Sequence, residues 1–270
     1  MATAQLGSIA IDAGLMGDMG EPNRGYGFAE SVKCRVRPQD EVWVISSRHL
    51  HWPDCTADDP GLKFWRWDCD INNWRKLSHG AFQETDSATV ATVMFVHGNR
   101  VDSWQAVDLG WYAYNSIIRQ GDNDRPVRYV IYSWPSTRLQ GSQADDLRFK
   151  ANRTNAEAYY LGHVVANIRE DVPVGLIGFS FGGRVVSGAL HVLGGGELCG
   201  NALPDELPRR GNVRSVLMAA AMHNFWIWPG SFHGQTLEST DRMLILANSC
   251  DKVLRRYHWL FKGSRPQALG

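Results

Sequence analysis

Residues 174–183 read Val-Gly-Leu-Ile-Gly-Phe-Ser-Phe-Gly-Gly, and this stretch decides the fold. A short apolar run stops at a serine that has a glycine two residues to either side, and a helical pattern follows. The pattern predicts a strand that turns sharply into a helix, with Ser180 at the turn. Side chains at Gly178 and Gly182 would collide with the neighbouring strand or helix, so glycine is expected at both positions.

The segment Gly178-Phe179-Ser180-Phe181-Gly182 matches the G-x-S-x-G pattern of a nucleophile elbow. Such a turn raises the serine hydroxyl above the sheet edge, and the following helix directs its N-terminal amides to the same place. Glycine-rich strand ends also occur in nucleotide-binding folds, so the pentapeptide alone does not decide the chemistry. The chain has no G-x-x-x-x-G-K-[ST] motif and fits G-x-G-x-x-G badly, which disfavours a nucleotide-binding site.

Apolar runs alternate with helical patterns along most of the chain. Besides the run before Ser180, strands are expected at residues 92–97, 127–134, 213–221 and 243–248. Helices are expected at residues 102–119, 143–170 and 252–262, and after Ser180 up to Gly194-Gly195-Gly196. This order predicts an α/β fold with a mostly parallel sheet and helices on both faces. Ligands of such sheets bind beyond the carboxyl ends of the strands.

The N-terminal part follows a different pattern. Residues 1–40 are glycine-rich and weakly patterned, which indicates a poorly structured arm. Residues 41–46 and 63–67 alternate as two strands around a turn at 58–61, and we expect an antiparallel hairpin that leads into the sheet. Residues 41–270 are therefore interpreted as one domain.

Composition excludes several classes of function. The 270 residues are 44% hydrophobic with a formal net charge of zero, which suits one large α/β domain and disfavours bulk attraction to nucleic acid or anionic membrane. No apolar stretch nears the length of a membrane span and no signal peptide is evident, so a soluble cytoplasmic protein is expected. No pattern indicates an oligomeric state.

Cysteine and histidine spacing points away from metals and disulfides. The five cysteines are scattered and are interpreted as reduced thiols. His49, His51 and Cys55 lie close together but match no standard zinc pattern, so neither a metal nor another cofactor is expected.

Nucleophilic catalysis by a serine needs two donors for the oxyanion, a base, and a carboxylate that orients the base. The backbone N–H of Phe181, directly after the serine, is the first expected donor. The second is the amide of Asn99, because Gly98 allows a close approach of the loop that follows residues 92–97. His97 is interpreted as a structural side chain that supports this loop rather than as the base.

The acid should follow a later strand, and Asp251 comes three residues after the run 243–248. No Asp or Glu lies between Ala219 and Leu237, so the preceding strand offers no competitor. Asp251 is therefore the expected acid. The alternative is that it caps the helix that follows, and both roles can coexist.

The sequence offers no well-placed histidine to act as the general base. Only His258 follows Asp251, seven residues later, and seven residues of a helix span roughly 10 Å. A base needs about 3 Å, so His258 is expected to be a helix-packing residue. One interpretation is that the chain lacks its last strand and the catalytic histidine. The other is that His223 or His233 serves instead, or that the base is absent.

Three segments carry a family resemblance. These are Val93-Met94-Phe95-Val96-His97-Gly98-Asn99, Val130-Ile131-Tyr132-Ser133-Trp134-Pro135-Ser136, and the glycine-flanked serine at 178–183. Together they resemble the α/β-hydrolase superfamily, and the Ser-Trp-Pro-Ser strand end resembles a bacterial subgroup of hydrolases called DUF900. The match covers about residues 90–255.

The resemblance implies Ser180 as nucleophile, the amides of Phe181 and Asn99 as oxyanion donors, and Asp251 as acid. It predicts a cofactor-free serine hydrolase that transfers an acyl group from an ester or thioester to Ser180 and then to water. Aromatic residues near the strand ends suggest an apolar acyl pocket, and residues 225–232 occupy a place where this fold often inserts a lid. The alternative is a binding or scaffold protein that has the hydrolase fold without its activity.

Overall fold

The computed structural model describes residues 36–50, 60–121, 124–261 and 266–270. The predicted arm at 1–40 therefore lies outside the described residues except for 36–40. His51, Cys55 and the first half of the expected turn at 58–61 also lie outside them.

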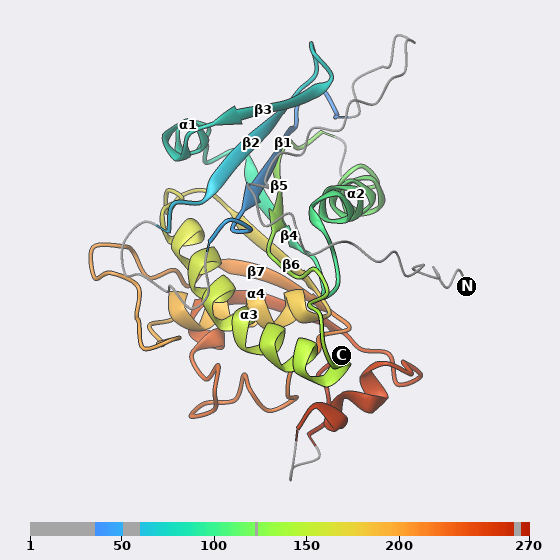
Figure 1. The fold of residues 1–270 in the computed structure, drawn as a ribbon. Helices are drawn as coiled ribbons and strands as arrows, with labels where there is room; N and C mark the ends of the chain where they lie inside the picture. Colours follow the sequence, from blue (N-terminus) through green and yellow to red (C-terminus); the bar gives the residue numbers. More distant parts are fainter. Residues whose placement is uncertain (1–35, 51–59, 122–123, 262–265) are drawn as a thin grey trace.

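Eight strands form one sheet in the order β3-β2-β1-β5-β4-β6-β7-β8 (Figure 1). From β1 to β8 across this order, all neighbours pair in parallel, whereas β2 is antiparallel to both β1 and β3. The fold is therefore α/β with a mostly parallel sheet, and the antiparallel pairing of β1 with β2 confirms the expected hairpin. The strands are β1 (Glu41–Ser46), β2 (Lys63–Asp68), β3 (Asn73–Leu77), β4 (Ala91–Val96), β5 (Val127–Ser133), β6 (Val174–Phe179), β7 (Val213–Met218) and β8 (Thr240–Leu246).

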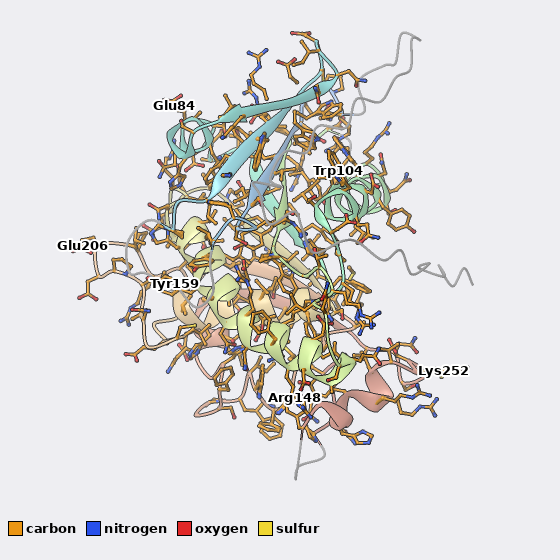
Figure 2. The ribbon with its side chains drawn as sticks, viewed as in Figure 1. Glu84, Trp104, Arg148, Tyr159, Glu206 and Lys252 are labelled. Carbon is orange, nitrogen blue, oxygen red and sulfur yellow. The ribbon has the colours of Figure 1, made fainter. Side chains whose placement is uncertain are left out.

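Helices cover both faces of the sheet, as predicted. Helix α2 (Ser103–Ala113) lies on one face, and the adjacent helices α3 (Gln143–Ala166) and α4 (Phe181–Leu193) lie on the other (Figure 1). Side chains of β5 alternate between the two: Val130 joins the cluster under α3 and α4, whereas Ile131 joins the cluster under α2. Figure 2 marks these two layers by Trp104 on α2 and Tyr159 on α3.

Several element ends differ from the predictions. Helix α2 stops at Ala113 and continues as a π-helical turn (Tyr114–Ile118), and α3 stops at Ala166 rather than 170. Strand β7 ends at Met218 because Ala219 has a positive φ of 46°, which breaks the extended backbone. The helix expected at 252–262 is a short 3₁₀ helix (Leu254–Leu260), and a second one spans Thr236–Ser239.

Two elements were not predicted from the sequence. Strand β3 reads Asn-Trp-Arg-Lys-Leu, which has little apolar character of its own, but its Trp74 packs edge-on against Trp67 of β2 at 5.2 Å between ring centres. Helix α1 (His79–Gln83) follows directly and is capped by Ser78, whose hydroxyl accepts from the Ala81 amide. Tertiary pairing, rather than local pattern, forms both elements.

The structure corrects one cysteine assignment. Cys69, just after β2, is disulfide-bonded, so the expectation of reduced thiols is wrong there. Cys199 and Cys250 are exposed and are not disulfide-bonded. Within the described part of the chain, none of the helices combines the length and the apolar character needed to cross a membrane.

A buried ion pair fastens the amino end of β5, opposite the edge where Ser180 lies. Arg128 Nη2 is 2.5 Å from Asp86 Oδ1, and both side chains are at most 3% exposed. The other carboxylate oxygen of Asp86 accepts the backbone N–H of Arg169 at 2.8 Å, so this carboxylate joins three segments.

We predict that Asp86→Asn lowers the free energy of unfolding by about 3 kcal/mol, because it leaves the Arg128 charge buried without its partner. Urea denaturation measures the loss. The matched control is Asp171→Asn, in a pair with Arg169 that is more than half exposed, and it should change stability by less than about 1 kcal/mol. Equal effects of the two substitutions would contradict the prediction.

Candidate active site at the carboxyl edge of the sheet

Ser180 sits at the junction of β6 and α4 in a strained backbone conformation. Its φ is 55° and its ψ is −116°, in a region that L-residues avoid. Three backbone hydrogen bonds hold it there. Its N–H donates to Met218 at 2.9 Å, and its carbonyl accepts from Gly183 and Ala221 at 3.0 and 3.1 Å. The structure therefore has the sharp strand-to-helix turn that the sequence predicted at this serine.

The glycines around Ser180 are required by close packing. A Cβ on Gly178 would lie 2.6 Å from the carbonyl oxygen of Gly182, and a Cβ on Gly182 would collide with that of Val96. A Cβ on Gly183 would lie 2.8 Å from the side chain of Ala220. The amino end of α4 thus lies directly against β4 and β6, and the separation is too short for a side chain at any of these three positions.

The loop after β4 approaches Ser180 as expected. A Cβ on Gly98 would lie 3.1 Å from Ser180 Cβ. The backbone N–H of the next residue, Asn99, makes no hydrogen bond with any described residue. Phe181 is the first residue of α4, so its N–H has no acceptor within the helix. The two expected oxyanion donors are thus unused backbone amides on residues adjacent to this contact.

His97 is buried under this loop. Its Nδ1 is 2.9 Å from the carbonyl oxygen of Gly98, and its Nε2 accepts the N–H of Trp134 at 3.2 Å. Burial, with a contribution from the nearby Arg48 guanidinium, lowers the pKa of His97 to about 3. A neutral ring with its proton on Nδ1 satisfies both contacts. His97 therefore holds the loop and is not placed to accept a proton from Ser180.

The Ser-Trp-Pro-Ser end of β5 braces the same loop. The indole Nε1 of Trp134 donates to the carbonyl of His97 at 2.9 Å, and the two rings stack. Ser136 exchanges hydrogen bonds with both backbone groups of Val101, at 3.0 and 3.1 Å. Its own carbonyl accepts the N–H of Arg100 at 2.8 Å. The segment that carries the family resemblance thus fixes the backbone of residues 97–101.

Arg48 completes this support from the end of β1. Its Nη2 donates to the carbonyls of Val101 and Asp102 at 3.1 Å each, and it lies 3.3 Å from His97 Nε2. Its Nε donates to Ser133 at 2.7 Å. One guanidinium therefore joins the ends of β1, β4 and β5. The sequence analysis did not identify Arg48. Its position just beyond the carboxyl end of a strand was the feature that could have indicated a role at this edge of the sheet.

Asp251 follows β8, where the sequence placed it, but its observed hydrogen bonds are those of a cap. Its Oδ1 accepts the backbone N–H groups of Val253 and Leu254 at 2.7 and 3.0 Å. This is the alternative role considered for it, and it leaves Oδ2 available for another donor. His258 lies in the 3₁₀ helix that begins at Leu254, with a half-buried side chain.

His223 lies in a polar chain that also includes Tyr257 and Arg184. Its Nδ1 is 2.8 Å from the Tyr257 hydroxyl, which accepts from Arg184 at 3.2 Å. Burial, aided by the Arg184 charge, lowers the pKa of His223 to about 4. This favours a neutral hydrogen-bond donor over a general base.

His233, the other alternative base, is paired with a different serine. Its Nδ1 is 3.0 Å from the Ser187 hydroxyl, and both side chains are buried. Burial holds the pKa of His233 well below its usual value. His233 thus belongs to the packing of α4 rather than to the sheet edge.

Ser180 Oγ makes no hydrogen bond with any of the described residues. The structure therefore brings together the serine, Gly98 and the amides of Phe181 and Asn99, but it pairs neither Asp251 nor a described histidine with that hydroxyl. Residues 266–270 also reach this region, where they lie antiparallel to 220–224. The sequence patterns did not place this segment.

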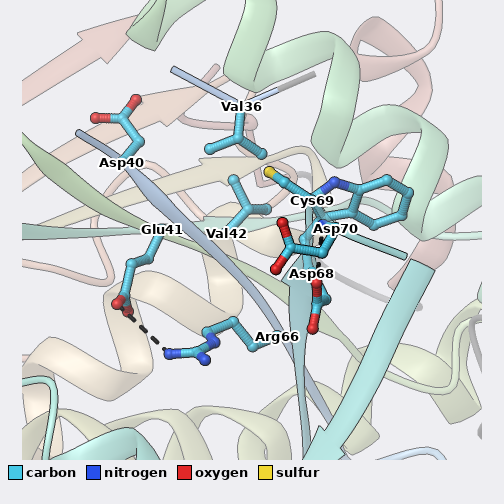
Figure 3. Close-up of a pocket in the computed structure, with 9 residues that line it drawn as sticks. Val36, Asp40, Glu41, Val42, Arg66, Asp68, Cys69 and Asp70 are labelled. Atoms are coloured by element: carbon cyan, nitrogen blue, oxygen red, sulfur yellow. Dashed lines mark hydrogen bonds and ion pairs between the residues drawn. The ribbon is translucent and has the colours of Figure 1, made fainter. Parts of the chain in front are cut away.

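A hollow lies far from Ser180, at the amino end of β1 (Figure 3). Four of its nine lining residues are acidic, and Arg66 pairs with Glu41 at 3.7 Å. Because β1 runs parallel to β6, this hollow is at the opposite edge of the sheet from Ser180. The lining residues are Val36, Asp40, Glu41, Val42, Arg66, Trp67, Asp68, Cys69 and Asp70. Among the described residues, no group of three or more His, Cys, Asp or Glu side chains is arranged to hold a metal ion.

We predict that Gly182→Ala lowers the free energy of unfolding by about 3 kcal/mol or more, because its Cβ would strike backbone rather than a movable side chain. The matched control is Gly175→Ala in β6, where the nearest atom to a new Cβ is 3.7 Å away. That substitution should cost less than about 1 kcal/mol. Denaturant unfolding compares the two, and a tolerated Gly182→Ala would contradict the packing described here.

We also predict that His97 makes stability depend on pH. Its native pKa of about 3 lies below the unfolded value near 6.5, so protonation favours the unfolded chain. The stabilisation is complete above about pH 6.5 and is lost as the pH falls toward 3. Between pH 7.5 and 4.5 the loss should be about 2.5 kcal/mol more in the wild type than in His97→Gln. Urea denaturation across this range tests it; parallel curves for the two proteins would exclude this role.

No protein-family model gives a significant match to this chain, and neither does any curated protein sequence or solved structure. A functional assignment therefore depends on the geometry at the carboxyl edge of the sheet. That geometry is a strained serine at a strand–helix junction, close to a braced loop with an unused backbone amide.

Proposed function

We propose that this protein is a serine hydrolase that cleaves carboxylic esters or thioesters through an acyl-Ser180 intermediate. The observation that carries the proposal is the backbone of Ser180, with its φ of 55° at the junction of β6 and α4. Strain of this kind persists where the surrounding structure demands it, and it is concentrated at functional sites. The unused amides of Asn99 and Phe181 support the same reading.

The chemistry follows from these groups. The hydroxyl oxygen of Ser180 attacks the acyl carbon while its proton passes to a general base, and the carbonyl oxygen takes the negative charge. The N–H groups of Asn99 and Phe181 would stabilise that charge, as would the amino end of α4. Collapse of the intermediate breaks the bond to the alcohol or thiol, which leaves with the proton held by the base. Water then attacks the acyl carbon, the bond to Ser180 Oγ breaks, and Ser180 regains a proton as the carboxylic acid is released. The reaction needs no cofactor, and its partner is a small acyl substrate.

The family part of the proposal is an α/β-hydrolase fold similar to the DUF900 hydrolases. The sheet order and the position of Ser180 after a central parallel strand support it. Asp251 is proposed as the acid through its free Oδ2, because it follows β8 at the same edge of the sheet. The cytoplasmic location expected from the sequence belongs to this proposal as well.

A second candidate function is binding without catalysis. The specific observation in its favour is that Ser180 Oγ has no hydrogen bond with a described histidine. The low pKa of His223 and its contact with Tyr257 point the same way, since they make that ring a poor base. A hydrolase-like frame could then hold a ligand above Ser180 without cleaving it.

Covalent labelling with a fluorophosphonate probe separates the two candidates. We predict that the folded wild-type protein is labelled and that Ser180→Ala abolishes labelling, because the probe reacts with activated serine hydroxyls. Ser187→Ala is the matched control, since it removes the serine paired with His233, and it should keep the label. Circular dichroism verifies that each variant is folded. An unlabelled but folded wild-type chain would favour the binding protein.

A further inference from the structure

We propose that the acyl substrate carries a second, negatively charged group, such as a carboxylate, and that Arg100 binds it. This inference rests on the proposed function and deepens it, because it names the substrate class of the same site. Four features of the structure support it: the position of Arg100, the way its side chain is held, the balance of charge around it, and a buried cation under the serine.

Arg100 lies within the reach of a small substrate bound at Ser180. It comes two residues after Gly98, whose Cβ position is 3.1 Å from Ser180 Cβ. Two residues span at most about 7 Å, so the backbone of Arg100 is close to the proposed oxyanion site. Its φ is 60°, a left-handed conformation that is uncommon for a residue with a long side chain. The hydrogen bond from its N–H to Ser136 fixes this turn.

The guanidinium of Arg100 is held in place and still accessible. With the amide oxygen of Gln143 turned toward it, that oxygen accepts from Nη1 and Nη2 at 3.1 and 3.0 Å. Its Nε lies 3.6 Å from Asp146 Oδ2, and the side chain remains 34% exposed. A fixed, partly exposed guanidinium loses little conformational entropy when it binds a carboxylate, and its planar donors suit one.

The charge of Arg100 is not neutralised by Asp146. The same carboxylate binds Lys150 more closely, at 2.6 Å between Nζ and Oδ1, and both of these side chains are 1% exposed. Its Oδ1 also accepts the N–H of Leu139 at 2.8 Å. Two cations therefore share one carboxylate, which leaves a net positive charge. The neighbouring Asp145 does not neutralise this remaining positive charge, because its carboxylate pairs with Arg148.

A second cation lies beneath the site. Arg184 follows Ser180 by four residues on α4 and is 4% exposed. The hydrogen bonds observed for its guanidinium go to neutral groups: Thr154, Tyr257 and backbone carbonyls. Its guanidinium lies over the rings of Trp226 and Phe181, at 4.4 and 5.5 Å from the ring centres. With Arg100, it gives this edge of the sheet a positive potential that favours an anionic substrate over a neutral one.

The test compares two esters of matched shape. Mono-4-nitrophenyl adipate carries a carboxylate at the far end of its acyl chain, and 4-nitrophenyl hexanoate does not. For the wild type at low salt we predict that kcat/KM is at least about 10-fold higher for the adipate ester. Arg100→Gln should lower the adipate value by about 10-fold and change the hexanoate value less than about 2-fold. The preference should also weaken as salt is added, since it is electrostatic.

The controls separate the possible failures. Arg214→Gln removes the same charge from an exposed pair near the amino end of β7, and it should leave both values unchanged. Equal rates for the two esters in the wild type, or equal losses in Arg100→Gln, would overturn the anionic-substrate inference but keep the hydrolase. Failure to cleave either ester, together with no fluorophosphonate labelling, would instead overturn the proposed function. If Arg100→Gln does not fold, the wild-type ratio and its salt dependence decide alone.

Discussion

The structure depends on one contact, the amino end of α4 pressed against the ends of β4 and β6. Gly178, Gly182 and Gly183 make this possible, because a Cβ at any of them would meet atoms at or below 2.8 Å. The close approach leaves Ser180 no ordinary helical or extended conformation, and its backbone takes a left-handed φ that three hydrogen bonds hold. Strain of this size is of order 1–3 kcal/mol. The packing of the whole helix against the sheet offsets this cost. The serine is therefore positioned by the core rather than by its own loop.

The loop opposite the serine is fixed by a different device, a buried polar network. His97, Trp134 and Arg48 link the carboxyl ends of three strands, and hydrogen bonds join each of these side chains to another segment. Such a network is rigid only when it is complete, because a buried donor or acceptor without a partner costs free energy. Neutral His97 is central to it: one ring nitrogen donates within the loop and the other accepts from β5. This network therefore holds the backbone of Asn99 in place, and the N–H group of Asn99 remains available as a hydrogen-bond donor.

The sequence predicted structure correctly where the signal is local, that is, where a residue type is required by its immediate neighbours in the chain. The apolar runs predicted the parallel strands, and the glycines at 178 and 182 predicted the turn, because both signals are local. Strand β3 and the brace by Arg48 were missed because only tertiary neighbours define them: Trp74 packs on Trp67, and Arg48 binds a loop some 50 residues away. The role of Asp251 stayed open between acid and cap for the same reason. Its position after β8 was readable in the sequence, but the direction of its carboxylate depends on the turn that follows.

The charges around Ser180 limit which base could serve it. Arg184 and Arg100 favour negative charge at this edge of the sheet, which suits an anionic substrate. The same cations oppose a protonated imidazole, and the low pKa values of His223 and His233 already include the influence of Arg184. A general base must accept a proton during the reaction, so a histidine here would need a carboxylate beside it to offset that potential. Asp251 follows the strand next to β7 and keeps one carboxylate oxygen free of its cap. Electrostatics thus ties any base that serves Ser180 to a neighbouring carboxylate such as Asp251, since a base in this field works only as the partner of an acid.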